Sequence, residues 1–121
     1  MADKLKLSTD SSNKLNYLSN RLNIKRNLVC RLAISVSIAQ KIKIETTINT
    51  DTNGYEFNKS TIFGPDEIYF KAITCYVQQK AADSDFFNVI IRNHIENGLN
   101  IMYDDYQKIN SPVGYLTSFI A

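Results

Sequence analysis

The longest apolar stretch of the chain, residues 28–39, is interrupted by polar side chains at regular intervals. Asn27, Arg31 and Ser35 are four residues apart, which places them on one stripe of a helix. The other positions are apolar on nearly every side, as is typical of a helix that is buried on several sides. We therefore predict a helix over about residues 25–39, and in so short a chain we expect neighbouring subunits to provide part of its cover.

The first residues of the chain alternate between polar and apolar side chains. This alternation over residues 4–7 predicts a short strand, with Leu5 and Leu7 facing inward and Lys4 and Lys6 together on the outer face.

A second helix is expected between this strand and the apolar stretch. Residues 8–10 are good N-caps, and Leu15, Leu18 and Leu22 then recur on one side of a helix. Asn23 follows, a residue that accepts the left-handed conformation of a tight turn. Strand, helix, turn and helix is the order of a ribbon-helix-helix unit, in which two chains pair their strands and interlock their helices. Because such a unit lacks a satisfactory core alone, we expect an obligate oligomer.

The middle of the chain, residues 41–64, is rich in Thr, Asn and Ile and is predicted to be an ordered loop with extended pieces, including a strand at 42–44. Gly64-Pro65-Asp66-Glu67 is a helix start, with Pro at the first position and carboxylates in the first turn. This third helix should reach about residue 80. The residues expected on its buried face are Tyr69, Ala72, Ile73, Tyr76 and Val77.

A fourth helix is expected to begin at Asp83 or Ser84 and to present a wide apolar face. That face consists of Phe86, Phe87, Ile90, Ile91, Ile95 and Leu99. Gly98 should weaken or end the helix, at a cost of about 1 kcal/mol relative to Ala. Helix is expected to continue over 99–109 until Ser111-Pro112 breaks it, before an apolar tail that docks on the rest.

The pattern as a whole predicts one mainly helical domain spanning residues 1–121. Its predicted parts are a strand-helix-helix part (1–40), an ordered loop (41–64), a helical part (65–110) and a tail (111–121). The length fits a single domain, and 44% hydrophobic with 21% charged residues is close to an ordinary soluble domain.

Charge divides the chain into two unlike halves. Residues 1–43 hold nine Lys and Arg against two acidic residues, and residues 44–121 hold five against ten, so the halves carry +7 and −5. This asymmetry favours a polyanionic partner for the front half over a merely solvated basic face.

The basic residues of the front half are the candidate contacts to such a partner. Lys14, Arg21, Lys25 and Arg26 cluster at helix ends and on one polar face, where they are suited to bind phosphate. The helix that begins near Arg26 also offers its positive end to anions. The candidate DNA-binding residues are Lys4, Lys6, Lys14, Arg21, Lys25, Arg26, Asn27 and Arg31.

Three members of that set have an alternative role. A lysine pair near a chain start, such as Lys4 and Lys6, is more often solubilising than base-reading. Arg31 lies on a mostly apolar helix and must be paired or reach water, so an ion pair with Glu56 or another carboxylate is favoured over direct DNA contact.

The sequence contains no pattern typical of a catalytic or metal site. Cys30 and Cys75 lie far apart in predicted helices, His94 is the single histidine, and no Cys/His spacing suits zinc. We therefore expect two reduced thiols, a core histidine, and neither metal nor cofactor. Glu56 is interpreted as pinning a loop. The absence of a secretory signal or bilayer-spanning segment favours a cytoplasmic protein without a membrane partner.

Aromatic residues offer a second mode of contact. Tyr55, Phe57, Tyr69 and Phe70 have the ring faces needed to stack on bases, although core packing is favoured for them.

Three blocks of residues, in a fixed order over about residues 5–100, resemble one known family. The first contains Asn20-Arg21-Leu22, Asn27-Leu28, Cys30-Arg31-Leu32-Ala33, Ser35 and Ser37; the second Gly54-Tyr55-Glu56-Phe57-Asn58 and Thr61-Ile62-Phe63-Gly64; the third His94-Ile95 and Gly98-Leu99. They resemble DndE, the small protein of bacterial DNA phosphorothioate (sulfur) modification systems. The family often has Gly in the first interhelical turn, where this sequence has Asn23.

The resemblance implies an all-helical, cytoplasmic accessory protein without chemistry of its own. It implies binding of double-stranded DNA with a preference for nicks, a homotetramer, and other Dnd sulfur-modification proteins as partners in a restriction-modification setting. Two alternatives stay open: a ribbon-helix-helix repressor that reads an operator through Lys4 and Lys6, and an assembly factor that binds the sulfur-transfer proteins and not DNA. A nuclease is disfavoured, because the sequence has no cluster of metal-binding carboxylates and no nucleophile with a base.

Overall fold

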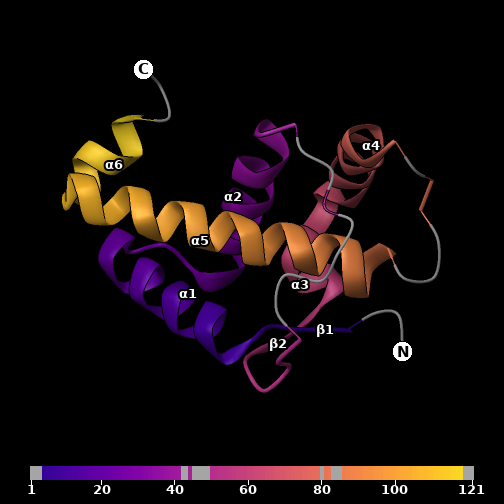
Figure 1. Ribbon diagram of the computed structural model, residues 1–121, viewed down its shortest axis with the longest axis horizontal. Coiled ribbons are helices and arrows are strands. Elements are labelled where there is room, and N and C mark those ends of the chain that lie inside the picture. Colours follow the sequence, from indigo (N-terminus) through magenta and orange to yellow (C-terminus); the bar gives the residue numbers. More distant parts are fainter. Residues whose placement is uncertain (1–3, 42–43, 45–49, 80, 83–85, 119–121) are drawn as a thin grey trace.

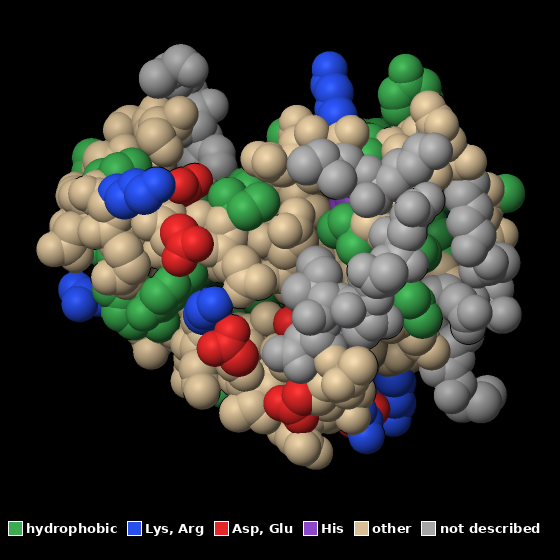
Figure 2. Space-filling model, viewed as in Figure 1, with side chains coloured by type: hydrophobic (Ala, Val, Ile, Leu, Met, Phe, Trp, Pro, Cys, Tyr) green, Lys and Arg blue, Asp and Glu red, His purple; other side chains and the backbone are tan. Residues whose placement is uncertain are grey.

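The computed structural model describes residues 4–41, 44, 50–79, 81–82 and 86–118, and it is mainly helical, as predicted. In chain order the elements are β1 (Lys4–Lys6), α1 (Thr9–Leu22), α2 (Arg26–Ala39), β2 (Glu56–Asn58), α3 (Lys59–Phe63), the 3-10 turn η1 (Gly64–Asp66), α4 (Glu67–Gln78), the π-helical turn η2 (Phe86–Ile91), α5 (Arg92–Ile109) and α6 (Pro112–Ser118). The long helix α5 runs across the molecule, with α2 crossing behind it (Figure 1). Side chains of both charge signs are scattered over the face seen in this view (Figure 2).

The front part of the chain forms the elements that its sequence predicts. Ser8 caps α1, because its hydroxyl accepts a hydrogen bond from the Ser11 backbone N–H. The apolar side of α1 is buried. Asn23 ends the helix in the left-handed conformation, with φ 56° and ψ 46°. This tight turn sends the chain directly into α2.

The strand β1 has the predicted faces and pairs with a strand of its own chain. Leu5 and Leu7 are buried and Lys4 is exposed. β1 pairs antiparallel with β2 of the same chain, with Leu5 opposite Phe57. Part of the segment interpreted as a loop therefore supplies a partner strand for β1 within the chain. The expected ribbon between two chains stays a prediction.

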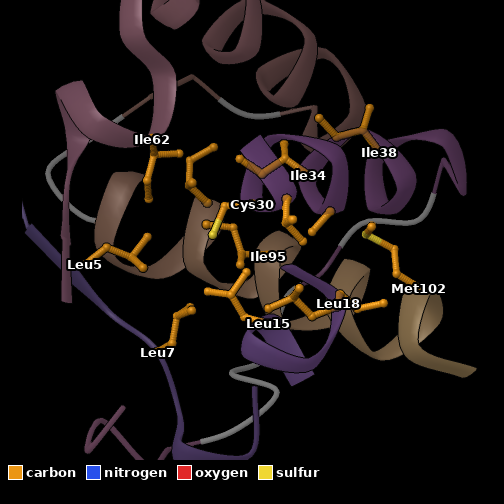
Figure 3. Packing of buried hydrophobic residues seen from close by; sticks show 14 of the residues in the cluster. Leu5, Leu7, Leu15, Leu18, Cys30, Ile34, Ile38, Ile62, Ile95 and Met102 are labelled. Atoms are coloured by element: carbon orange, nitrogen blue, oxygen red, sulfur yellow. The ribbon is translucent and has the colours of Figure 1, made fainter. Parts of the chain in front are cut away.

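The core lies where α1, α2 and α5 meet. Figure 3 shows Leu15 of α1, Ile34 of α2 and Ile95 of α5 pointing into one shared space. The pairing of α2 with α5 is the most extensive helix contact of the chain. The core of the strand-helix-helix part is therefore completed by α5 of the same chain. The expected cover of part of α2 by neighbouring subunits stays a prediction. Most of the cover of α2 comes from its own chain.

Gly98 makes the crossing of α2 and α5 possible. A Cβ atom built at Gly98 would lie 1.9 Å from the carbonyl oxygen of Ala33, so only glycine fits between the two helices. Gly98 does not end the helix: α5 continues to Ile109, as expected for residues 99–109, and Asn110 caps it in the left-handed conformation. The gain in packing outweighs the low helix propensity of glycine.

In the rest of the rear half, α5 and the segments at its two ends agree with the prediction from the sequence. All six residues predicted for the apolar face of the fourth helix are buried. The predicted caps at 83–84 and the strand over 42–44 fall at least partly outside the described residues. The tail forms α6 and docks through Tyr115, whose ring centroid lies 5.8 Å from that of Tyr106. No helix among the described residues is long and apolar enough to span a bilayer.

Helix α4 forms as predicted but does not bury the face that was predicted. Tyr69 is 70% exposed, Ile73 is 51% exposed and Tyr76 is 83% exposed. Its inward side instead carries Thr74 and Gln78, both buried. Because α4 has apolar residues on both sides, periodicity alone does not determine which side packs on the core.

We expect Gly98→Ala to lower the free energy of unfolding by roughly 1–3 kcal/mol, because the added methyl group forces α2 and α5 apart. Helix propensity alone predicts the opposite sign, a gain of about 1 kcal/mol. Urea denaturation followed by circular dichroism measures the change. Gln107→Ala, on the exposed side of α5, is the control and should stay within about 0.5 kcal/mol of wild type. A Gly98→Ala protein as stable as wild type would contradict the close-crossing interpretation.

Candidate nucleic-acid interface

Three exposed basic residues surround the turn between α1 and α2, and we call them the basic corner: Arg21, Lys25 and Arg26. Arg21 lies in the last turn of α1, Lys25 is the N-cap of α2, and Arg26 is the first residue of α2. The left-handed Asn23 brings these helix ends together. The corner therefore presents three cations within one turn of the chain.

The arginines of the basic corner rest on tyrosine rings and keep their charge available. The guanidinium carbon of Arg21 lies 5.2 Å from the ring centroid of Tyr17, and that of Arg26 lies 4.6 Å from the ring centroid of Tyr55. Among the described residues, no carboxylate forms a salt bridge with any member of the corner. A cation on an aromatic face is oriented without being neutralised.

The N-terminus of α2 adds to the positive potential of the corner. Lys25 makes no side-chain capping hydrogen bond, and the first turn of α2 contains no acidic residue. The first N–H groups of a helix have no partner within the helix, and they carry the positive end of its dipole. The corner therefore combines three cations with a helix end that itself favours an anion.

Lys14 lies away from the corner and is held within the protein. Its ammonium group lies 3.1 Å from the Asp10 carboxylate and donates a 2.7 Å hydrogen bond to the side chain of Asn100. The side chain is 22% exposed. These contacts give Lys14 a role in holding α1 against α5, and its contact with DNA stays a prediction.

Lys4 and Lys6 project from the outer face of the small sheet. Lys4 lies opposite Asn58 and Lys6 opposite Glu56, and the ammonium group of Lys4 is 3.9 Å from the Glu56 carboxylate. Lys6 of β1 lies just before the start of α1, and Arg21 lies in the last turn of that helix, about 20 Å further along its axis. The structure therefore separates these lysines from Arg21. Figure 2 likewise shows no continuous basic patch on its face of the molecule.

Asn27 and Arg31 bind the end of α3. The Asn27 amide donates to the carbonyl of Thr61 at 3.2 Å, and the Arg31 Nε–H donates to the carbonyl of Ile62. The predicted ion pair between Arg31 and Glu56 is wrong, because Glu56 faces Lys4 and a backbone carbonyl satisfies Arg31. The polar stripe on α2 therefore fixes α3 in place.

Two buried charged residues of α5 were absent from the sequence-based candidates. Glu96 accepts hydrogen bonds from the Ser8 N–H at 2.8 Å, from the Ser8 hydroxyl at 2.9 Å and from the Ser11 hydroxyl at 2.6 Å. Arg92 lies 3.7 Å from Glu96 and donates to the carbonyl of Lys6 at 2.6 Å. The signal in the sequence is an Arg and a Glu four residues apart within the apolar face of one helix.

The model of the family "DNA sulphur modification protein DndE" matches residues 4–110. The chain belongs to the DndE family.

Two solved structures share the fold of this DndE family member. One is the crystal structure of DndE from Escherichia coli B7A, involved in DNA phosphorothioation modification, with a TM-score of 0.64 and 17% identity over 81% of this chain and 94% of that chain. The other is a DndE glycine-to-lysine mutant involved in DNA phosphorothioation, with a TM-score of 0.64 and 17% identity over 84% of this chain and 97% of that chain. No curated protein matches the chain. The family match connects this chain with DNA sulfur modification.

The single histidine of this DndE family member is a buried core residue, as predicted. Gln78 makes two hydrogen bonds with the backbone of Ile44, which fixes its amide with the oxygen toward His94. His94 Nε2 lies 3.0 Å from that oxygen, and Nδ1 lies 2.7 Å from the Ser37 hydroxyl. Nε2 therefore carries the proton and donates it in a hydrogen bond to Gln78, and Nδ1 accepts a hydrogen bond from the Ser37 hydroxyl. This network joins α2, α4 and α5.

Burial shifts the pKa of two groups of the core, His94 and Cys30. Burial lowers the pKa of His94 from 6.5 to about 4 and raises the pKa of the Cys30 thiol to about 12. Cys30 and Cys75 are both free thiols. Within the described part of the chain, no group of three or more His, Cys, Asp or Glu residues could hold a metal ion.

We expect stability to fall as the pH drops from about 6.5 to 4, because in this window the unfolded chain binds a proton at His94 that the folded chain rejects. His94 makes its full contribution to the free energy of unfolding above its pKa in the unfolded chain. At acid pH at most about 3 kcal/mol of that free energy is lost. Urea denaturation of wild type and His94→Gln at several pH values isolates this contribution from that of the carboxylates. Parallel pH profiles for the two proteins would show that His94 is not its source.

Proposed function

We propose that this DndE family member is a non-catalytic, DNA-binding accessory subunit of the DNA sulfur modification machinery, which holds duplex DNA through the basic corner and prefers nicked duplex. The observation that carries the proposal is the set of three exposed cations at the N-terminus of α2, none paired with a carboxylate within the described residues. Phosphate contacts of this kind position a protein on DNA without reading its sequence. Such a role also suits a cytoplasmic protein.

The exposed apolar face of α4 supports a homo-oligomer, and we propose a tetramer. Ile68, Tyr69, Ile73 and Tyr76 are all more than half exposed, and contiguous apolar surfaces of this kind mark protein contacts. A symmetric assembly would direct several basic corners at one DNA molecule and so strengthen its electrostatic field. Other Dnd proteins are the further partners that we propose for this system.

The two alternative functions are supported unequally. A ribbon-helix-helix repressor needs β1 of one chain to pair with β1 of another, whereas β1 here pairs with β2 of its own chain. An assembly factor that does not bind DNA is favoured by the apolar face of α4. DNA binding and its dependence on the corner distinguish this alternative from our proposal.

We expect the protein to bind nicked and gapped duplexes more tightly than intact duplex of the same sequence. Its affinity for all three should fall steeply as the salt concentration rises. The double variant Arg21→Glu with Lys25→Glu should weaken binding to all three duplexes by about tenfold or more, because phosphate contacts are lost and replaced by repulsion. Fluorescence anisotropy across a salt series measures both effects.

The matched control for this charge reversal is Lys41→Glu with Lys71→Glu, which changes the net charge equally. Lys41 follows the far end of α2 and Lys71 is exposed on α4. Lys41 lies beside Ile73 and Tyr76 of the α4 face, so light scattering first establishes that both variants keep the wild-type mass. At that mass the control variant should bind within about twofold of wild type at moderate salt, where charges beyond a Debye length are screened. An equal loss in both variants, or no binding by wild type, would refute the corner as a DNA site and favour the assembly factor.

We expect Ile68→Glu with Tyr76→Glu to dissociate the oligomer. Each new carboxylate would be buried in the interface without a partner, which is energetically costly. Size-exclusion chromatography with light scattering gives the mass of each species. Val113→Glu is the control, because Val113 is 72% exposed on α6. A wild-type monomer, or a variant that keeps the wild-type mass, would show that the α4 face is not the interface.

A further inference from the structure

Tyr55 is the aromatic residue that the structure holds firmly against the basic corner. Its backbone N–H donates to the Ser12 hydroxyl at 2.8 Å, and its carbonyl accepts from the Leu7 N–H at 2.8 Å. Its ring lies under the Arg26 guanidinium and meets Phe57 edge-on, with ring centroids 6.4 Å apart. Tyr55 is half-buried and Arg26 is exposed, so the pair lies at the protein surface.

Gly54 brings the Tyr55 segment close to the start of α1. A Cβ atom built at Gly54 would lie 2.1 Å from the Ser12 hydroxyl oxygen and 2.3 Å from the Ser8 carbonyl oxygen. The Gly54 N–H donates to the Leu7 carbonyl at 2.9 Å. With no room for a side chain, the segment packs backbone against backbone, and the position of the Tyr55 ring is set by the fold.

Charge alone gives the basic corner no means to distinguish nicked from intact DNA. The two duplexes carry nearly the same phosphates, and phosphates are what cations contact. They differ in the bases, because a base pair at a nick lacks covalent continuity on one strand and is easier to unstack. Unstacking costs least where the duplex is already weakened, and an exposed base face gains energy on an aromatic or guanidinium surface.

The other tyrosine of the corner is less available for such a contact. The ring centroid of Tyr17 lies 5.3 Å from that of Tyr103 and 5.9 Å from that of Tyr106, which is fully buried. Tyr17 therefore belongs to an aromatic cluster of the core between α1 and α5. Among the described residues, Phe57 is the one aromatic ring that meets Tyr55.

We infer that Tyr55 is a specificity-determining residue: with Arg26 it forms a surface on which the base exposed at a strand interruption stacks. This inference rests on the proposed function and deepens it. The cations of the corner supply affinity for any duplex, and the pair of Tyr55 and Arg26 supplies the preference for a nick. The ligand is thus the π-face of a nucleobase beside phosphate.

The test compares the dissociation constants of each protein for intact and nicked duplexes of one sequence. Their ratio is measured on one preparation, so a partly unfolded variant does not distort it. Tyr55→Leu should lower the preference for the nick by about fivefold or more while leaving affinity for intact duplex within about twofold. Tyr55→Phe keeps the ring and should keep the preference. Tyr17→Leu, which also removes a ring beneath an arginine, should leave the ratio unchanged.

A spectroscopic measurement tests the contact itself. The chain has no tryptophan, so Tyr55→Trp introduces a single reporter at the corner. We expect its fluorescence to be quenched by nicked duplex and to change little with intact duplex, because stacking on a base requires an accessible base face. Equal quenching by both duplexes would indicate proximity without stacking and would overturn the inference.

The outcomes separate this inference from the function on which it rests. A wild-type preference for the nick that survives in Tyr55→Leu overturns the stacking surface and leaves the proposed function intact. Equal wild-type binding of nicked and intact duplexes overturns the preference and the stacking surface, but leaves phosphate binding by the corner. Absence of DNA binding by wild type overturns both.

Discussion

The carboxylate of Glu96 determines where the front half of the protein can lie. It is buried, so it requires hydrogen-bond donors, and it finds them in the backbone and hydroxyl of Ser8 and the hydroxyl of Ser11. The start of α1 is thereby fixed to the middle of α5. Arg92, one turn earlier, donates to the carbonyls of Lys6 and Asp51 and so holds β1 and the segment that leads to Tyr55. One turn of α5 thus positions both sides of the candidate interface.

The crossing of α2 and α5 decides which apolar surface remains uncovered. Because Gly98 lets the two helices approach backbone to backbone, α2 is covered largely by its own chain. The part of α4 that carries Tyr69 and Tyr76 receives no such cover and stays exposed. The partner contact that we propose therefore lies at α4 and not at the strand-helix-helix part, where the ribbon-helix-helix pattern had located it. This location is consistent with the pairing of β1 with β2 of the same chain.

Features governed by neighbouring residues were predicted from the sequence, and features governed by distant ones were not. The Ser8 cap, the left-handed Asn23 and the alternation of β1 depend on a few adjacent residues, and all were predicted. The pairing of β1 with β2 joins segments about fifty residues apart, and the acceptor for Arg31 is a backbone carbonyl, which has no sequence signature. At the candidate interface the basic residues were identified, but their environments were not. The contact between Arg26 and Tyr55 appears only after folding.

The structure divides the basic residues of the front half into two kinds, and this division bears on how the protein would meet DNA. Lys14 and Lys4 lie beside carboxylates, whereas Arg21 and Arg26 lie on aromatic rings. A carboxylate cancels much of the field that a distant phosphate would experience, whereas a ring orients a guanidinium and leaves its field intact. Three cations of the front half without a carboxylate partner among the described residues therefore lie at one turn of the chain. Three cations can contact only a few phosphates of a long duplex. The affinity for DNA would therefore depend on the number of corners that an assembly presents to one DNA molecule.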